Sequence, residues 1–233
     1  MLVAIHQPNF LPWLGFFDKL ARSDVFVLLD NVALQLTGGN YTNRVQMLVN
    51  GTPAWITVPV KRGREARERI DTAESAARPE WRKKTLRTIE QSYAKAPYFA
   101  LTMPLVERTL SHEGASLVEM NLVGILGIAD AVGAGTDRLV RASTLATEGS
   151  STALLASIVS ALGGTAYLTG HGAGRYQDDE IFAERGIEVV RQGFEHPTYP
   201  QQRTTTFHPG LSAIDALMNC GPATASFLAS RRQ

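Results

Sequence analysis

The sequence predicts an α/β fold in which a mixed, mainly parallel sheet carries helices on both faces. Two short apolar runs, Leu2 to Ile5 and Val25 to Leu29, each end at a polar residue, and the segment between them, Leu11 to Arg22, has helical periodicity. Uninterrupted apolar strands joined by a helix are typical of a parallel sheet that is covered on both faces. We therefore expect the chain to begin with a Rossmann-like β-α-β unit.

A hairpin and a helical middle section are predicted next. Residues 45–60 hold an Asn-Gly pair between two β-prone runs, which indicates a hairpin and makes the sheet mixed. Pro79 stands where a helix opens, and residues 117–132 form the best candidate for a buried helix. The middle of the chain is therefore expected to be helical.

The last third of the chain returns to alternating helices and strands. No linker or change of composition divides the sequence, so we expect one domain over residues 1–233. The expected elements are a helix over 151–162, a strand over 166–169, a helix over 178–185, a strand over 187–190, and short helices near 212–218 and 222–230.

The composition limits the classes of partner. The 23 basic and 22 acidic residues nearly cancel, so no overall field attracts nucleic acid or an anionic membrane, and we expect a small-molecule substrate. The single cysteine, Cys220, excludes a disulfide framework within one chain and suits a reducing compartment. Neither a signal-peptide pattern nor a membrane-spanning segment is present. We therefore expect a cytoplasmic protein.

The strongest local motif is HQPNFLPW, residues 6–13. Its two prolines stiffen the turn after the first strand, and so fix the directions of the His6 and Gln7 side chains. A histidine held rigidly at the carboxyl end of a strand is a candidate catalytic residue. The alternative is that His6 only makes a structural hydrogen bond at a tight crossover.

Polar residues after the second strand and before the hairpin are further candidates. Asp30 lies close enough to orient His6 as a general base if the first two strands are neighbours. The alternative is that Asp30 starts a turn. Arg44, which follows Asn43, is placed either to bind a phosphate or carboxylate or to lie on the surface.

Two later loops also hold candidates. The glycine-rich loop over residues 170–176 follows an apolar strand, where backbone amides can bind an anion, and Gly172 and Tyr176 are its substrate-binding candidates. It matches neither the P-loop nor the dinucleotide fingerprint, and we expect no cofactor. His196 opens a second proline-stiffened segment, HPTYPQ. The five histidines lack metal-ligand spacing, so we expect no metal site.

Seven segments, in chain order from Ile5 to Gly221, resemble the motif blocks of the WbqC-like protein family. They are IHQPNFLPWLGFFDKL, SDVFVLLDNV, the Asn-Arg pair at 43–44, WITVPV, YLTG, HPTYPQ and LSAIDALMNCG. The resemblance implies group transfer in the biosynthesis of bacterial O-antigen, of other surface polysaccharides or of specialised metabolites (natural products). The residues that fall in the blocks are His6, Gln7, Pro8, Asp30, Asn43, Arg44, His196, Tyr199 and Gln201. His171 and Cys220 stand where the family has no fixed histidine or cysteine.

The leading hypothesis is an acyl- or aminoacyl-transferase that acts on an amine of a sugar or small-molecule intermediate. His6 is its general base, Asp30 orients His6, and Arg44 or Gln7 holds the donor or acceptor. His196 is a further catalytic candidate, and the other substrate-binding candidates are Asn43, Tyr199 and Gln201. A carrier protein bearing an acyl or aminoacyl thioester is a candidate partner for the basic helix side at residues 82–87.

Two alternatives stay open. By analogy of fold alone, the first β-α-β unit resembles that of nucleotidylyltransferases, which would use a nucleoside triphosphate with magnesium. The other alternative is a non-catalytic scaffold or binding protein of a biosynthetic complex, in which the two histidine turns are structural.

Overall fold

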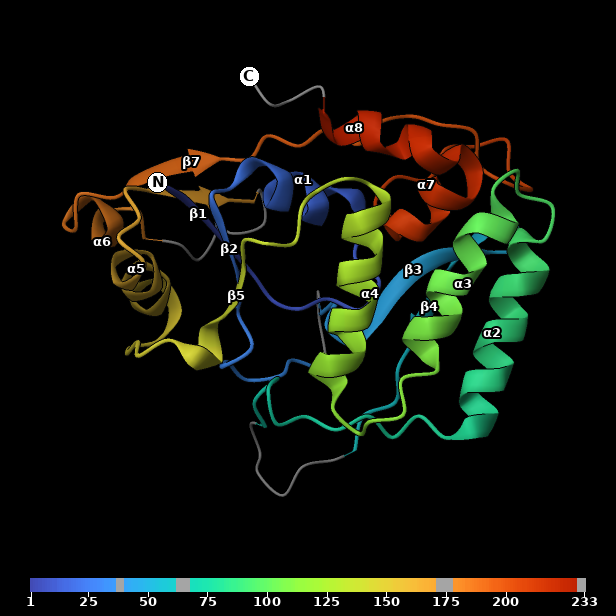
Figure 1. Ribbon diagram of the computed structural model, residues 1–233, viewed down its shortest axis with the longest axis horizontal. Helices are drawn as coiled ribbons and strands as arrows, with labels where there is room; N and C mark the ends of the chain where they lie inside the picture. The colour runs from blue at the N-terminus through green and yellow to red at the C-terminus, as the bar shows by residue number, and fades with distance from the viewer. Residues whose placement is uncertain (37–39, 62–67, 171–177, 230–233) are drawn as a thin grey trace.

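A five-stranded sheet forms the centre of the computed structural model, which describes residues 1–36, 40–61, 68–170 and 178–229 (Figure 1). The strands are β1 (Leu2–His6), β2 (Val25–Leu28), β5 (Leu139–Arg141), β6 (Ala166–Thr169) and β7 (Glu188–Arg191), in the order β5-β2-β1-β6-β7. Every pairing among these strands is parallel. By chain order this is third, second, first, fourth, fifth, the order of a Rossmann-type sheet. The predicted α/β fold class is confirmed.

Helices cover both faces of this sheet. The side chains of β1 alternate, so Ala4 packs into one hydrophobic cluster, and Val3 and Ile5 pack into another on the opposite face. The helices are α1 (Leu14–Arg22), α2 (Pro79–Tyr93), α3 (Phe99–Leu110), α4 (Leu117–Ala131), α5 (Ser151–Ala161), α6 (Glu180–Ala183), α7 (Ala213–Cys220) and α8 (Ser226–Ala229), with 3-10 turns η1 (Ala142–Thr144) and η3 (Gly221–Ala225). Figure 1 shows α5 and α6 at one end of the molecule and α2, α3 and α7 at the other.

The predicted hairpin is present, but it forms a sheet of its own. Strands β3 (Arg44–Val49) and β4 (Thr52–Thr57) pair antiparallel across the Asn50-Gly51 turn. Asn50 and Gly51 both have positive φ, which is the requirement of a tight hairpin turn and the reason for the Asn-Gly pair. The antiparallel pairing is therefore separate from the parallel sheet, and the hairpin lies on the side of the helical middle section (Figure 1).

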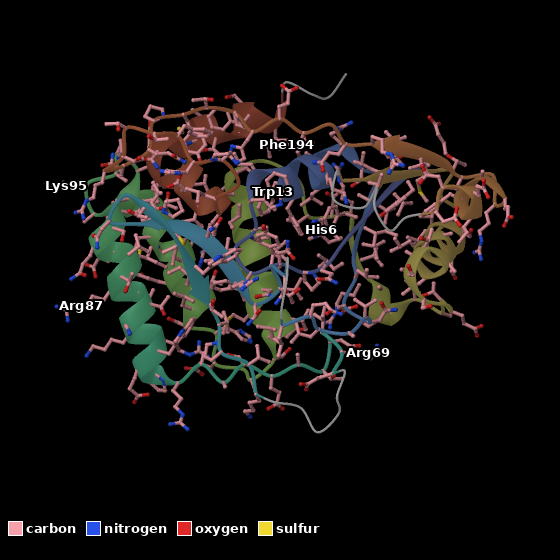
Figure 2. All side chains as sticks on the ribbon, turned by 180° about the vertical axis from the view of Figure 1, so that it is seen from behind. His6, Trp13, Arg69, Arg87, Lys95 and Phe194 are labelled. Atoms are coloured by element: carbon pink, nitrogen blue, oxygen red, sulfur yellow. The ribbon has the colours of Figure 1, made fainter. Side chains whose placement is uncertain are left out.

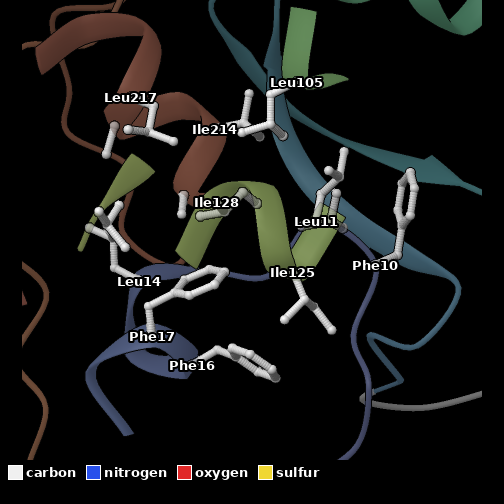
Figure 3. Close-up of a cluster of buried hydrophobic side chains, with 14 of the residues drawn as sticks. Phe10, Leu11, Leu14, Phe16, Phe17, Leu105, Ile125, Ile128, Ile214 and Leu217 are labelled. Atoms are coloured by element: carbon white, nitrogen blue, oxygen red, sulfur yellow. The ribbon is translucent and has the colours of Figure 1, made fainter. Parts of the chain in front are cut away.

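The larger hydrophobic cluster joins the first turn and α1 to the helical section (Figure 3). Its fully buried members include Phe10, Leu14 and Phe17 from the start of the chain, Ile125 and Ile128 from α4, and Ile214 from α7. Burying a side chain of this size contributes about 1.5–3 kcal/mol. The helices therefore hold the segment that follows β1 in one position.

Two details differ from the predicted elements. The first helix begins at Leu14 instead of Leu11, because Leu11 has a φ of 42° and Pro12 follows it, so residues 11–13 belong to the turn. Strand β5 was not predicted: three residues are too few to show a period, and only the parallel pairing with β2 makes them a strand. Among the described residues, no helix has both the length and the apolar composition needed to cross a bilayer.

Candidate functional site

A cleft of about 690 Å³ opens at the carboxyl ends of the central strands. Its lining includes His6 and Gln7 from β1 and the residue after it, Lys19 from α1, Thr169 from β6, and Gln192 directly after β7. Strands β1 and β6 are neighbours, whereas the chain leaves β1 for β2 on the other side. The order therefore reverses between β1 and β6, and in open α/β sheets ligands bind at this switch point. We take this cleft as the candidate site.

Buried hydrogen bonds hold the turn that presents His6. Asn121 on α4 donates from Nδ2 to the carbonyl oxygens of Pro8 and Thr42, at 2.8 and 2.7 Å. The Ser212 hydroxyl donates to the Leu11 carbonyl at 2.8 Å, and the Gln7 side-chain oxygen accepts from the Thr42 hydroxyl at 3.2 Å. A buried turn outside regular structure must have its carbonyl groups satisfied in this way. The turn is therefore rigid, as the two prolines predict.

His6 is held as a neutral ring with one open acceptor. Its Nδ1 lies 3.0 Å from the carbonyl oxygen of Gln7, and because a carbonyl only accepts, Nδ1 carries the proton and Nε2 the lone pair. The ring also packs edge-on against Phe16, with centroids 5.0 Å apart. Burial and the charge of Lys19 lower the pKa of His6 from 6.5 to about 3, and the bond to Gln7 opposes them. His6 therefore faces the cleft as a hydrogen-bond acceptor at physiological pH.

Lys19 lines the candidate site as well, and the sequence patterns did not point to it. Its side chain is buried and lines the same cleft, and Nζ donates to the carbonyl oxygen of Ile5 at 2.9 Å. Burial lowers the pKa of this lysine from 10.5 to about 7. A signal was available, since every other residue of α1 before Arg22 is apolar or glycine, so the charged pair Asp18-Lys19 stands out.

Gln192 lines the cleft directly after β7. Its Nε2 donates to the Gly15 carbonyl at 2.7 Å and to Oδ2 of Asp18 at 2.8 Å, and its own carbonyl accepts from Arg22 at 2.6 Å. These bonds connect the end of β7 to α1, so the two walls of the cleft are fixed relative to each other. Trp13 and Phe194 add an aromatic wall, with ring centroids 5.4 Å apart (Figure 2).

Asn43 and Arg44 do not line the cleft. The Asn43 amide accepts from Asn40 at 2.6 Å and donates to the Val58 carbonyl at 2.9 Å. The guanidinium of Arg44 lies 4.4 Å from the ring centre of Trp55. Trp55 in turn packs on Tyr41, which does line the cleft. Arg44 therefore supports the wall through Trp55 and Tyr41, whereas Asn43 holds the segment before β3 to the residue after β4.

His196, Tyr199 and Gln201 also lie outside the lining. His196 stacks on Trp13 at 6.3 Å, and burial lowers its pKa. Tyr199 and Gln201 donate to the same oxygen of Asp215, at 2.9 and 3.0 Å, so their polar groups are used inside the fold. These three residues therefore do not line the cleft with His6: His196 lies against Trp13 of its aromatic wall, and Tyr199 and Gln201 bind α7.

Asp30 does not pair with His6, which corrects the predicted general-base pair. Its carboxylate is fully buried and accepts from Arg141 Nε at 2.6 Å and from the backbone N–H and hydroxyl of Ser143, each at 2.8 Å. Strand β2 lies between β1 and β5, and Asp30, beyond its end, turns toward β5. The hydrogen-bond partner of His6 is the Gln7 carbonyl instead.

A comparison with known protein families covers the same stretch of the chain as these motif blocks. The profile of the WbqC-like protein family matches residues 7–227, nearly the whole chain. The chain belongs to the WbqC-like protein family. It is also 29% identical over 233 residues to "Uncharacterized protein Rv1507c" of Mycobacterium tuberculosis, an alignment that covers 99% of both chains. No solved structure matches the chain significantly.

In this WbqC-like chain, residues of three motif blocks line the cleft: the first block, Leu29 of SDVFVLLDNV, and Tyr167, Thr169 and Gly170 of YLTG. His6 and Gln7 line the cleft, whereas the block residues at 30, 43, 44, 196, 199 and 201 hold neighbouring segments in place. Gly172 and Tyr176 lie outside the described residues, although Gly170, which precedes them, lines the cleft. Within the described residues, no three His, Cys, Asp or Glu side chains gather as metal ligands.

Asp30→Ala is expected to lower the free energy of unfolding of this WbqC-like protein by about 2–4 kcal/mol, because it leaves the Arg141 guanidinium and two Ser143 donors without their buried acceptor. Urea denaturation at neutral pH measures the change. Asp137→Ala is the matched control, since the side chain of Asp137 is 86% exposed. Equal stability of the two variants would contradict the structural role of Asp30.

Proposed function

We propose that this WbqC-like protein is a biosynthetic transferase that moves an acyl or aminoacyl group onto an amine of a sugar or small-molecule intermediate. The observation that carries the proposal is the neutral acceptor nitrogen of His6, held rigidly at the switch point of the sheet. The family resemblance supports the setting, which is surface-polysaccharide or specialised-metabolite biosynthesis in the cytoplasm. A group transfer of this kind requires no redox cofactor.

The electrostatics of the cleft favour an amine over its ammonium form. Both His6 and Lys19 have lowered pKa values because burial disfavours positive charge there. An amine that enters the cleft meets the same conditions and is therefore favoured as the neutral base, which is the nucleophilic form. The lone pair of His6 Nε2 accepts a hydrogen bond from its N–H and so orients it.

The proposed transfer needs one proton carrier. The amine nitrogen attacks the carbonyl carbon of the donor, and as the new N–C bond forms the nitrogen becomes cationic. His6 Nε2 then accepts the N–H proton, the bond between the carbonyl carbon and the leaving group breaks, and His6 returns the proton to the leaving group. A pKa of about 3 makes His6 a weak base in the free protein, so the proton moves only after the amine has become acidic in the adduct.

A carrier protein as donor partner remains part of this proposal. The basic side of α2 is smaller than the sequence suggests, because Arg82 donates to the carbonyl oxygens of Ala77 and Leu110. The cavity between α2 and α3 is lined by both basic and acidic residues, including Lys83, Arg87, Glu90 and Glu107. Charge alone therefore does not select an acidic carrier here, and free thioesters are the first donors to test.

His6→Asn is expected to slow transfer by about 10²- to 10⁴-fold while the fold is retained. The Asn amide can still donate to the Gln7 carbonyl, but no acceptor then stands where Nε2 is. Mass spectrometry of amine acceptors incubated with acyl-coenzyme A or aminoacyl thioesters measures product.

The control for this experiment is His112→Asn, because His112 follows α3 and does not line the cleft. A thermal-shift screen with nucleotide sugars, acyl-coenzyme A and amino acids identifies ligands that stabilise wild type but not His6→Ala. Full transfer activity in His6→Asn would sink the proposed role. A screen in which no compound binds would instead favour a scaffold.

A nucleotidylyltransferase-like activity is a second candidate, favoured by a neighbouring cavity of about 520 Å³. This cavity is lined by the first residues of α5, from Ser151, and it shares Gln7 with the main cleft. A helix N-terminus favours phosphate groups, so a triphosphate could extend from one cavity to the other. This candidate predicts magnesium-dependent release of pyrophosphate from a nucleoside triphosphate, which the transferase proposal does not.

A further inference from the structure

Among the residues that the structure describes, the buried ammonium group of Lys19 has no counter-ion. Lys19 is 4% exposed, and the hydrogen bond from Nζ to the Ile5 carbonyl uses one of the three N–H donors of the ammonium group. Within the described parts of the chain, Lys19 forms no ion pair; the nearest acid in sequence, Asp18, is bound by Arg22 and Gln192. Buried charges in proteins are ordinarily paired, because desolvation of a lone charge is strongly unfavourable.

The cleft around Lys19 supplies no negative charge either. Its described lining has no Asp or Glu, and its polar members are amides, hydroxyls and the His6 ring. The hydrogen bond to Ile5 places Nζ at the carboxyl end of β1, beside His6. An acceptor that enters the cleft therefore finds a cation with unused donors in a desolvated place, where charge-assisted hydrogen bonds are strong.

We propose that Lys19 binds an anionic group of the substrate, a carboxylate or phosphoryl oxygen, inside this cleft. The inference deepens the proposed function, since it concerns the same site, and it names the substrate class: a donor or acceptor that carries such an anion close to its reacting group. The anion completes the ion pair that the protein leaves open, and it anchors the substrate beside the acceptor nitrogen of His6.

The protonation of Lys19 gives this proposal a pH signature. The titratable side chains that line the cleft with it are His6 from β1, Tyr167 from β6 and Tyr41 from the segment before β3. The pKa of His6 is lowered to about 3 and that of Tyr167 is raised to about 12, so neither changes charge near neutrality. On its own helix, Asp18 and Arg22 bind each other. The affinity for an anion should therefore change with pH as Lys19 gains or loses its proton.

The test uses two simple anions whose charge is constant above about pH 6: sulfate, which represents a phosphoryl group, and oxalate, which represents a carboxylate. Isothermal titration at constant ionic strength gives the affinity at about pH 6 and about pH 9. For a pKa of about 7, wild type should bind about 100-fold more weakly at the higher pH. Whichever anion binds more tightly identifies the group.

Lys19→Met should abolish this binding at both pH values, and Lys19→Gln, which keeps a neutral donor for the Ile5 carbonyl, should abolish it too. Lys84→Met is the matched control, since Lys84 is exposed on α2 and lies outside the cleft. It should bind as wild type does.

Binding that is equal at the two pH values, or that survives Lys19→Gln, overturns the proposal, and the first of these outcomes needs no variant to fold. The proposed transfer activity is measured separately. Anion binding without any transfer would leave Lys19 as an anion site and remove the transferase. Transfer that is unaffected by Lys19→Gln would keep the transferase and remove Lys19 as the anion site.

Discussion

Asp215→Ala is expected to lower the free energy of unfolding by about 3–5 kcal/mol. Asp215 is fully buried on α7, and its carboxylate accepts from Tyr93 at 2.7 Å, Tyr199 at 2.9 Å and Gln201 at 3.0 Å. The Tyr93 hydroxyl also accepts from the backbone N–H of Leu48. The carboxylate thus connects α7, α2, β3 and the HPTYPQ segment. Its removal leaves two buried tyrosine hydroxyls without an acceptor and takes one of the two acceptors of the Gln201 amide.

Urea denaturation at neutral pH measures this loss, and a graded variant tests its cause. Asp215→Asn retains one acceptor oxygen, so it should lose about 1–3 kcal/mol, less than the alanine variant. Asp130→Ala, at an exposed position of α4, should change stability by less than about 0.5 kcal/mol. If Asp215→Ala were as stable as Asp130→Ala, the carboxylate would not be the connection that the structure indicates.

Lys19→Met is expected to change stability in the opposite direction, with a gain of about 2–4 kcal/mol below about pH 6. Burial lowers the pKa of Lys19 from 10.5 to about 7, so the folded protein binds fewer protons than the unfolded chain between these values. The free energy of unfolding of wild type therefore rises with pH through this window, and the penalty of the buried charge is complete only below about pH 7.

Methionine removes this penalty while keeping most of the volume, although it also removes the donor to the Ile5 carbonyl, which reduces the gain. The advantage of Lys19→Met should shrink as the pH rises from about 7 to about 10. Lys84→Met controls for the loss of a positive charge at the surface. A stability difference that is the same at pH values of about 6 and about 10 would show that the wild-type ammonium is not desolvated.

Most of the fold could be predicted from the sequence because its signals are local. The strand over residues 166–169, the helix that opens at Pro79 and the Asn-Gly hairpin all appear where the pattern places them. Each depends on neighbours along the chain: an apolar run, a fixed proline φ, or two residues that tolerate positive φ. Strand β5 is the exception, because its three residues form a strand only by pairing with β2.

Part of the lining of the cleft could also be predicted from the sequence, for a related reason. The turn at His6 and Gln7 is stiffened by its own prolines and ends a central strand, so its place at the sheet edge follows from sequence. The partner of Asp30 could not be predicted in this way. Arg141 lies 111 residues away in sequence and reaches Asp30 only because β5 is next to β2 in the sheet. The same holds for Tyr199, whose hydroxyl binds Asp215 inside the fold.

The sequence by itself determined the α/β class, the WbqC-like family and the position of the first histidine turn, since each is carried by contiguous residues. The tertiary structure alone decided which polar side chains share a cleft. Lys19 shows the physical reason. Its burial, its lowered pKa and the lack of a counter-ion among the described residues all depend on what is packed around it, and none of them is local in sequence.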